Sequence, residues 1–216
     1  MGKSASMTLP TKITIVRLIM IPLILVCYCL QPLYKYLFIV TALLFIIASM
    51  TDYLDGHIAR KYNMVSDLGK LLDPIADKVL VAAGLFMLVD GNYIPEIPYI
   101  ELICSVVIIA REFMIGVLRQ VAALKGVALA ADKLGKIKTA TTMFGLTFLL
   151  CSANDALIFK IFRYIGIVFF LLATLFTVIS GINYIVKNAQ LLVGEEKDAK
   201  DEQETTAQDI AKEDKE

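Results

Sequence analysis

Six long apolar runs follow one another along the chain, separated by short polar turns. They predict helices at about residues 13–30, 37–60, 67–89, 99–124, 128–152 and 159–185, the last with room to extend to 192. Runs of this length are long enough to cross the hydrocarbon core of a bilayer. We therefore expect an all-α, polytopic membrane protein with six transmembrane helices, preceded by a short interfacial N-terminal segment.

Composition supports a membrane protein and divides the chain in two. Hydrophobic residues make up 58% of the 216 positions, and the mean hydropathy is +0.72, which is unusually apolar for a soluble domain. Residues 194–216 hold ten of the 21 acidic and four of the 21 basic residues, so this tail carries a charge of −6 and residues 1–193 carry +6. We expect a membrane domain over 1–193 and a cytoplasmic tail over 194–216 that is disordered or a solvated helix.

The distribution of positive charge predicts the orientation. Lys and Arg gather around the turns after the second and fourth helices, whereas the turn after the third helix has none. The positive-inside rule places both termini and the basic turns in the cytoplasm. A basic body suits anionic partners such as lipid headgroups and phosphates, and we expect no nucleic acid. No organelle-targeting pattern is evident, which favours a bacterial plasma membrane.

Four aspartates interrupt this apolar background. Asp52 and Asp55 lie three residues apart at the end of the second helix, and Asp73 and Asp77 lie four apart at the start of the third. Each spacing places a pair on one helix face. A short turn makes the two helices antiparallel neighbours, so four carboxylates would converge. Such a cluster repels itself unless a cation such as Mg²⁺, Mn²⁺ or Ca²⁺ lies within it. The single histidine, His57, excludes a His-based triad or zinc site within one chain.

The spacing of these residues resembles a known family signature. It reads Asp52-x2-Asp55-Gly56-x2-Ala59-Arg60-x8-Gly69-x3-Asp73-x3-Asp77, and it matches the CDP-alcohol phosphatidyltransferase family at every position. Further segments are similar to the bacterial phosphatidylglycerophosphate synthase branch: residues 9–17, 111–113, 118–123 and 133–139. That branch more often has Asn where this chain has Thr11. The resemblance covers about residues 8–190 and leaves the tail outside it.

The resemblance implies a reaction and a set of residue roles. The phosphatidyl group of CDP-diacylglycerol passes to sn-glycerol 3-phosphate, which gives phosphatidylglycerophosphate and CMP. Two Mg²⁺ or Mn²⁺ ions would be held by Asp52, Asp55, Asp73 and Asp77, with Asp77 also the catalytic base. CDP-diacylglycerol would be bound by Asp55, Gly56, Ala59, Arg60 and Gly69. The acceptor phosphate would be bound by Arg111, Arg119, Lys136 and Lys138. The resemblance also implies a homodimer.

Three alternatives stay open on the sequence. The same chemistry could use inositol phosphate, phosphatidylglycerol or serine as the acceptor. Carboxylates inside a membrane bundle also mark ion pathways, so a divalent-cation transporter is possible, although no polar stripe reaches the opposite face. A scaffold without catalysis would be badly served by buried, unpaired carboxylates. For Arg111, the structural alternative to phosphate binding is an ion pair with Glu112 or with another helix.

Overall fold

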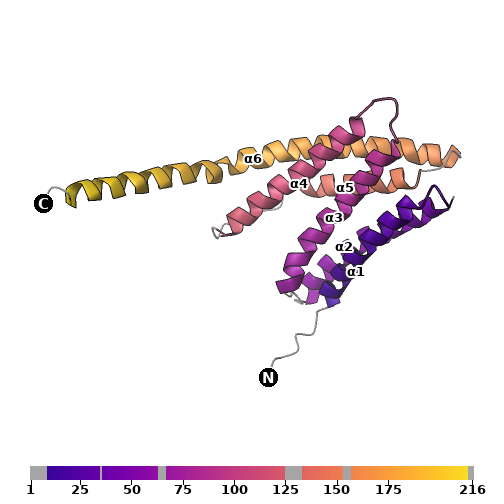
Figure 1. The fold of residues 1–216 in the computed structure, drawn as a ribbon, viewed down its shortest axis with the longest axis horizontal. Helices are drawn as coiled ribbons and strands as arrows, with labels where there is room; N and C mark the ends of the chain where they lie inside the picture. Colours follow the sequence, from indigo (N-terminus) through magenta and orange to yellow (C-terminus); the bar gives the residue numbers. More distant parts are fainter. Residues whose placement is uncertain (1–8, 35, 63–66, 125–132, 153–156, 214–216) are drawn as a thin grey trace, which may run out of the picture.

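The computed structural model describes residues 9–34, 36–62, 67–124, 133–152 and 157–213. Within these ranges the chain forms α-helices and no strand (Figure 1). The helices are α1 (Leu9–Cys29), α2 (Leu37–Tyr62), α3 (Asp67–Gly91), α4 (Ile100–Leu124), α5 (Lys133–Leu150) and α6 (Leu157–Glu213). The prediction of an all-α fold with six helices is confirmed for this part of the chain.

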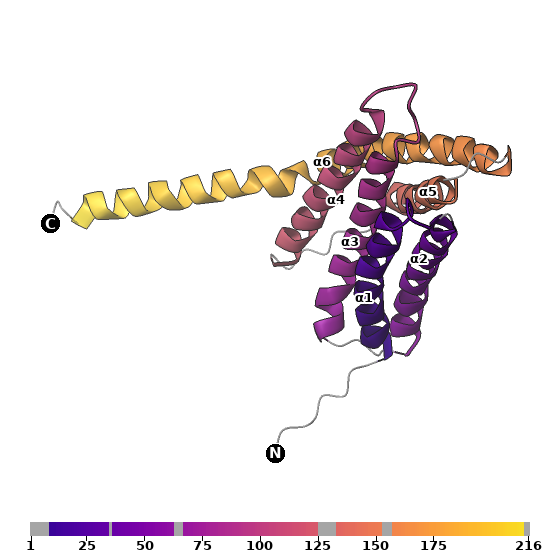
Figure 2. The same ribbon diagram turned by 45° about the vertical axis from the view of Figure 1, so that its right-hand side comes forward.

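The two ends of the chain differ most from the prediction. α1 begins four residues earlier than expected, at Leu9, because Pro10 is well placed in a first turn, where its missing N–H is not needed. α6 continues through the charged tail to Glu213, so the structure has a helix where a disordered chain was one of our two expectations. Ala, Glu, Lys and Gln are good helix formers, which accounts for this extension. The tail runs away from the other helices (Figures 1 and 2). The domain boundary at residue 193 stays a prediction.

α1 lies between α2 and α3 and packs against both (Figure 2). α2 and α3 run antiparallel and also touch each other, as the short connection predicted. α3 further contacts α4 and α5, while α5 packs along α6, which is inclined to the first three helices. The start of α1, the end of α2 and the start of α3 therefore lie together at one end of the molecule, where the aspartate motif is located.

The other end of α1 and α3 is fixed by polar contacts. The Tyr28 hydroxyl is 2.9 Å from both the carbonyl oxygen of Met87 and a carboxylate oxygen of Asp90. The buried Glu101 carboxylate accepts the backbone N–H of Ile94 at 2.8 Å. These contacts fix the ends of α1 and α3 that lie opposite the aspartate motif. They therefore help to hold the two helices in place relative to each other.

Apolar side chains fill the core and also cover the outside. Phe45, Leu80 and Phe170 are fully buried, whereas Ile19 and Phe86 are about two-thirds exposed, at 66% and 65%. Among the described residues, two stretches are long and apolar enough to cross a membrane by length and composition, Thr11–Cys29 and Leu157–Lys187. A shorter apolar stretch covers Leu37–Thr51. Six membrane spans therefore remain a prediction.

Candidate functional site

The first turns of α3 carry two of the four aspartates, and α1 holds one of them in place. Asp73 and Asp77 are one turn apart and both are partly buried. The Thr14 hydroxyl of α1 donates a hydrogen bond to a carboxylate oxygen of Asp73. Thr14 itself is fully buried, whereas Asp73 keeps part of its surface accessible. The orientation of Asp73 is thus set by a neighbouring helix as well as by its own.

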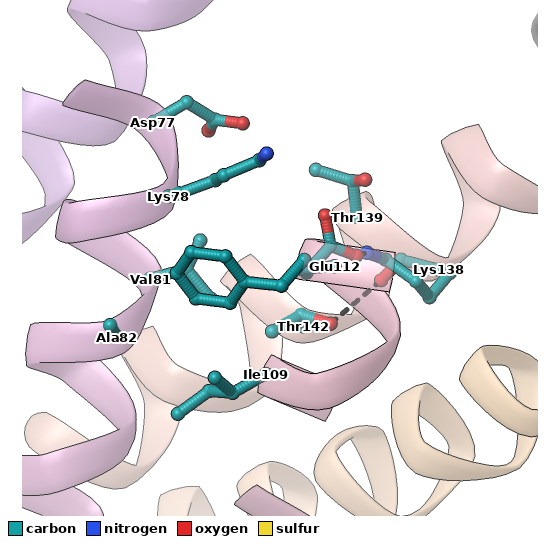
Figure 3. A pocket seen from close by; sticks show the side chains of 10 residues that line it. Asp77, Lys78, Val81, Ala82, Ile109, Glu112, Lys138, Thr139 and Thr142 are labelled. Atoms are coloured by element: carbon teal, nitrogen blue, oxygen red, sulfur yellow. Dashed lines mark hydrogen bonds and ion pairs between the residues drawn. The ribbon is translucent and has the colours of Figure 1, made fainter. Parts of the chain in front are cut away.

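Asp77 opens onto a pocket between three helices (Figure 3). Each of the three helices, α3, α4 and α5, forms one wall of the pocket. The lining residues are Asp77, Lys78, Val81, Ala82, Ile109, Glu112, Phe113, Lys138, Thr139 and Thr142. In Figure 3 the apolar side chains of Val81, Ala82 and Ile109 lie below the charged groups, so the pocket combines a few polar groups with an apolar wall.

Glu112 connects two of the predicted phosphate-binding cations. Its carboxylate forms an ion pair with Lys138 and lies 3.3 Å from a guanidinium nitrogen of Arg111. The second terminal nitrogen of Arg111 donates to the Ser180 hydroxyl of α6 at 3.0 Å. Arg111, Glu112 and Lys138 are largely buried, with side-chain exposures of 10%, 24% and 4%. The ion pair that was the structural alternative for Arg111 is therefore present, and it holds Arg111 beside the pocket.

The other two predicted phosphate-binding residues lie differently. Arg119 donates from Nε to the Tyr184 hydroxyl at 3.2 Å, and its guanidinium lies 5.4 Å from the centre of that ring. Lys136 is exposed. Neither Arg119 nor Lys136 lines the pocket that contains Asp77. The structure thus brings Lys138 into the pocket, places Arg111 behind it, and leaves Arg119 and Lys136 outside.

The second half of the predicted site falls on α2. The backbone of its last turns is helical, so Asp52 and Asp55 keep the spacing that puts them on one face. The side chains of Asp52, Asp55, Gly56, Ala59 and Arg60 lie outside the part that the structure describes. Gly69 is buried on α3. Within the described residues, no three His, Cys, Asp or Glu side chains gather closely enough to hold a metal. The convergence of four aspartates therefore stays a prediction.

Comparison with known proteins identifies the family. Residues 7–181 match the CDP-alcohol phosphatidyltransferases. The chain belongs to this family. It is 40% identical over 177 residues to the CDP-diacylglycerol–glycerol-3-phosphate 3-phosphatidyltransferase of Rickettsia bellii (strain RML369-C), over 82% of this chain and 92% of that protein. It is 38% identical over 195 residues to the protein of the same name from Bacillus subtilis (strain 168), over 85% and 96%. It is also 36% identical over 159 residues to the cardiolipin synthase (CMP-forming) of Oryza sativa subsp. japonica, over 70% of this chain and 48% of that protein.

Sequence reasoning missed several polar residues of this phosphatidyltransferase. The sequence assigns no role to Thr14, yet in the structure its hydroxyl donates to Asp73. The available signal was periodicity, because Thr11, Thr14 and Arg17 recur every three residues in an apolar run and all three are buried. The sequence suggests Glu112 only as a partner of Arg111, and in the structure it also pairs with Lys138. No local sequence pattern predicts this ion pair, because its two residues lie on different helices, α4 and α5.

Proposed function

We propose that this phosphatidyltransferase moves the phosphatidyl group of CDP-diacylglycerol to sn-glycerol 3-phosphate, giving phosphatidylglycerophosphate and CMP. The observation that carries the proposal is the pocket in which Asp77 of the family signature faces Lys138 and the Glu112–Arg111 pair. A carboxylate beside buried cations suits an acceptor that has both a hydroxyl to be deprotonated and a phosphate to be bound. The names of the bacterial relatives agree with this reaction.

The donor set of the signature suits divalent metals. All four aspartates offer hard carboxylate oxygens, and Asp73 and Asp77 stand on consecutive turns of α3. We assign two Mg²⁺ or Mn²⁺ ions to Asp52, Asp55, Asp73 and Asp77. When bound, such ions offset the charge of the diphosphate and stabilise the departing CMP.

The chain's own residues would then divide the remaining work. Asp77 takes the proton of the acceptor hydroxyl, whose oxygen forms a bond to the phosphorus that carries diacylglycerol. The bond from that phosphorus to the CMP oxygen breaks, and its electron pair leaves with CMP. Lys138 and Arg111 bind the acceptor phosphate, with Arg119 and Lys136 further out, where they attract the anion toward the pocket. On α2 and α3, Asp55, Gly56, Ala59, Arg60 and Gly69 bind the nucleotide and diphosphate of the donor.

The proposal includes a place in the cell. We assign all six helices as membrane spans of a bacterial plasma membrane, with the site and both termini on the cytoplasmic side and the N-terminal segment at the interface. Exposed apolar side chains on the helix exteriors, such as Ile19 and Phe86, support contact with a lipid bilayer. Both substrates suit this place, because the donor is a lipid and the acceptor is water-soluble. We further assign a homodimer, on family resemblance.

The direct test is turnover by purified protein. Protein in detergent is incubated with CDP-diacylglycerol and labelled glycerol 3-phosphate, with Mg²⁺, with Mn²⁺ or with a chelator, and CMP and labelled lipid are measured. We expect both products in equal amounts and only with metal. Asp77→Asn should reduce turnover by at least about a hundredfold, the lower range of a general base. Near-normal turnover by Asp77→Asn would refute the role of Asp77 as base.

A second acceptor has a specific observation in its favour. The rice relative is named as a cardiolipin synthase, and a reaction of that class would use phosphatidylglycerol as the acceptor. Parallel assays with phosphatidylglycerol, inositol phosphate and serine separate these options. Product with phosphatidylglycerol alone would keep the aspartate assignments and overturn the acceptor assignment. The buried cations near the pocket argue against serine, which has no phosphate.

A further inference from the structure

Lys78 directly follows the last aspartate of the signature, and its side chain reaches from α3 across to α4. Its ammonium lies 5.6 Å from the centre of the Phe113 ring. A Cβ atom added to Gly116 would collide with the same nitrogen. Phe113 and Gly116 are three residues apart on one face of α4, so together they form a seat for the ammonium, with an aromatic face on one side and open backbone on the other.

The charge balance of the pocket makes this cation unusual. Lys138 and Arg111 are both paired with the Glu112 carboxylate. Lys78, in contrast, has the Phe113 ring as its neighbour and forms no ion pair with any residue that the structure describes. A half-buried ammonium that lacks an anion loses hydration without full compensation. In Figure 3 the ammonium points away from α3 toward Thr139 of α5, into the space of the pocket.

We propose that Lys78 is a further substrate-binding residue, whose ammonium binds a phosphate oxygen of the acceptor from the side opposite Lys138. This inference rests on the proposed function. The acceptor is favoured over the donor diphosphate because Lys78 shares its pocket with Asp77, the assigned base, and with Lys138. A three-carbon acceptor holds its phosphate close to its attacking hydroxyl, so one small pocket must serve both groups. The assigned donor residues lie instead on α2 and at Gly69.

The experiment compares four variants. Lys78→Met keeps the length and removes the charge, Lys78→Arg keeps the charge, and Gly116→Ala leaves Lys78 intact but occupies its seat. Lys160→Met removes one exposed lysine from α6, outside the pocket, as a matched control. For each, steady-state KM and kcat are measured against glycerol 3-phosphate at saturating donor, and against CDP-diacylglycerol in mixed micelles at saturating acceptor. Direct binding of labelled glycerol 3-phosphate without donor is measured in parallel.

Loss of one charge-assisted hydrogen bond predicts a rise of about tenfold to a hundredfold in the acceptor KM of Lys78→Met. The donor KM should stay within about twofold, a change too small to represent a lost hydrogen bond. Gly116→Ala should raise the acceptor KM by a smaller factor, and Lys78→Arg should recover most of the affinity. The control should match wild type. If Lys78→Met does not fold, Gly116→Ala carries the test, because its added methyl meets only the flexible end of the lysine.

Two kinetic results would overturn the inference. A rise in the donor KM alone would assign Lys78 to the diphosphate instead, and unchanged constants in both Lys78→Met and Gly116→Ala would leave it without a role in binding. The binding measurement separates this failure from failure of the proposed function. Wild-type protein that neither binds nor uses glycerol 3-phosphate refutes the function itself. Wild type and Lys78→Met that bind it equally refute only the inference.

Discussion

At the scale of single residues, the least expected contact is the one between Thr14 and Asp73. A hydroxyl that donates to one carboxylate oxygen fixes which oxygen faces the site, and partners of this kind commonly set the affinity of a metal ligand. Because Thr14 is fully buried, no water molecule can easily replace it. The contact also makes α1 part of the site, although α1 supplies none of the signature aspartates.

We therefore expect Thr14→Val to weaken metal activation. The concentration of Mg²⁺ that gives half-maximal turnover should rise by about tenfold to a hundredfold, while Thr14→Ser should stay close to wild type because it keeps the hydroxyl. The stabilisation of the protein by Mg²⁺ in a thermal melt should fall in parallel. Thr177→Val is the matched control, since Thr177 is equally buried but donates to Ala173 of its own helix. Equal metal dependence in Thr14→Val and Thr177→Val would contradict the assignment.

Glu112 illustrates a different residue-scale effect, because it balances two buried cations. Replacing it with Ala leaves Arg111 and Lys138 without their shared carboxylate, a change that costs on the order of 3 kcal/mol. An external anion in the pocket should restore part of this loss. We expect Glu112→Ala to melt at a lower temperature than wild type, and to gain more from added glycerol 3-phosphate than wild type gains.

Glu101→Ala provides the comparison for that melt. Glu101 is also buried, but it accepts the N–H of Ile94 at the opposite end of the bundle, where no phosphate is expected. It should lose stability but gain no more from glycerol 3-phosphate than wild type gains. A larger gain in Glu101→Ala than in Glu112→Ala would show that the anion acts elsewhere than at the Arg111–Lys138 pair.

At the scale of elements, close packing of α5 on α6 positions Lys138 opposite α3. Two glycines permit it. A Cβ on Gly145 would lie 3.0 Å from the backbone nitrogen of Phe170, and one on Gly166 would lie 2.9 Å from that of Leu149. Backbone atoms cannot move aside as the end of a flexible side chain can. Small residues at such crossings are typical of helices that pack in membranes.

Gly145→Ala and Gly166→Ala should therefore each destabilise the protein, by about 1 to 3 kcal/mol, because the two helices must separate. Thermal unfolding in detergent, followed by loss of monodisperse protein, measures the effect. Gly135→Ala on α5 is the control, since its nearest neighbour would be 3.9 Å away, at ordinary contact distance. If all three variants melted alike, close approach of α5 and α6 would not be a source of stability.

The sequence predicts the elements better than it predicts the site between them. Helix bounds agree within a few residues for α2, α3 and α4, because long apolar runs there end at clear turn residues. The aspartate spacing likewise placed Asp73 and Asp77 on one face of α3. The spacing of residues along the chain does not predict the contacts between helices. The bond from Arg111 to Ser180 joins residues 69 positions apart, and it depends on how α4 and α6 cross. For the tail, the sequence leaves a disordered chain and a solvated helix both open, because the tail has no apolar face to bury.

At the scale of the whole molecule, the charge pattern makes a prediction about orientation that the fold allows to be tested. The turn after α3 contains no Lys or Arg, whereas Lys187 lies at the end of the apolar stretch Leu157–Lys187 of α6. Six spans would put these two positions on opposite sides of the membrane. Tyr99 is 76% exposed and Lys187 is also exposed, so a cysteine is accessible at either position.

In a variant without the four native cysteines, Tyr99→Cys should react with a membrane-impermeant maleimide in intact cells, and Lys187→Cys should react only after permeabilisation. Labelling of both positions in intact cells would reject six spans with a cytoplasmic C-terminus. In that topology α4, α5 and α6 each cross the membrane once between the two positions, so the positions must lie on opposite sides. The reverse pattern would place the pocket around Asp77 outside the cell, away from any supply of glycerol 3-phosphate, and would overturn the assigned orientation and acceptor together.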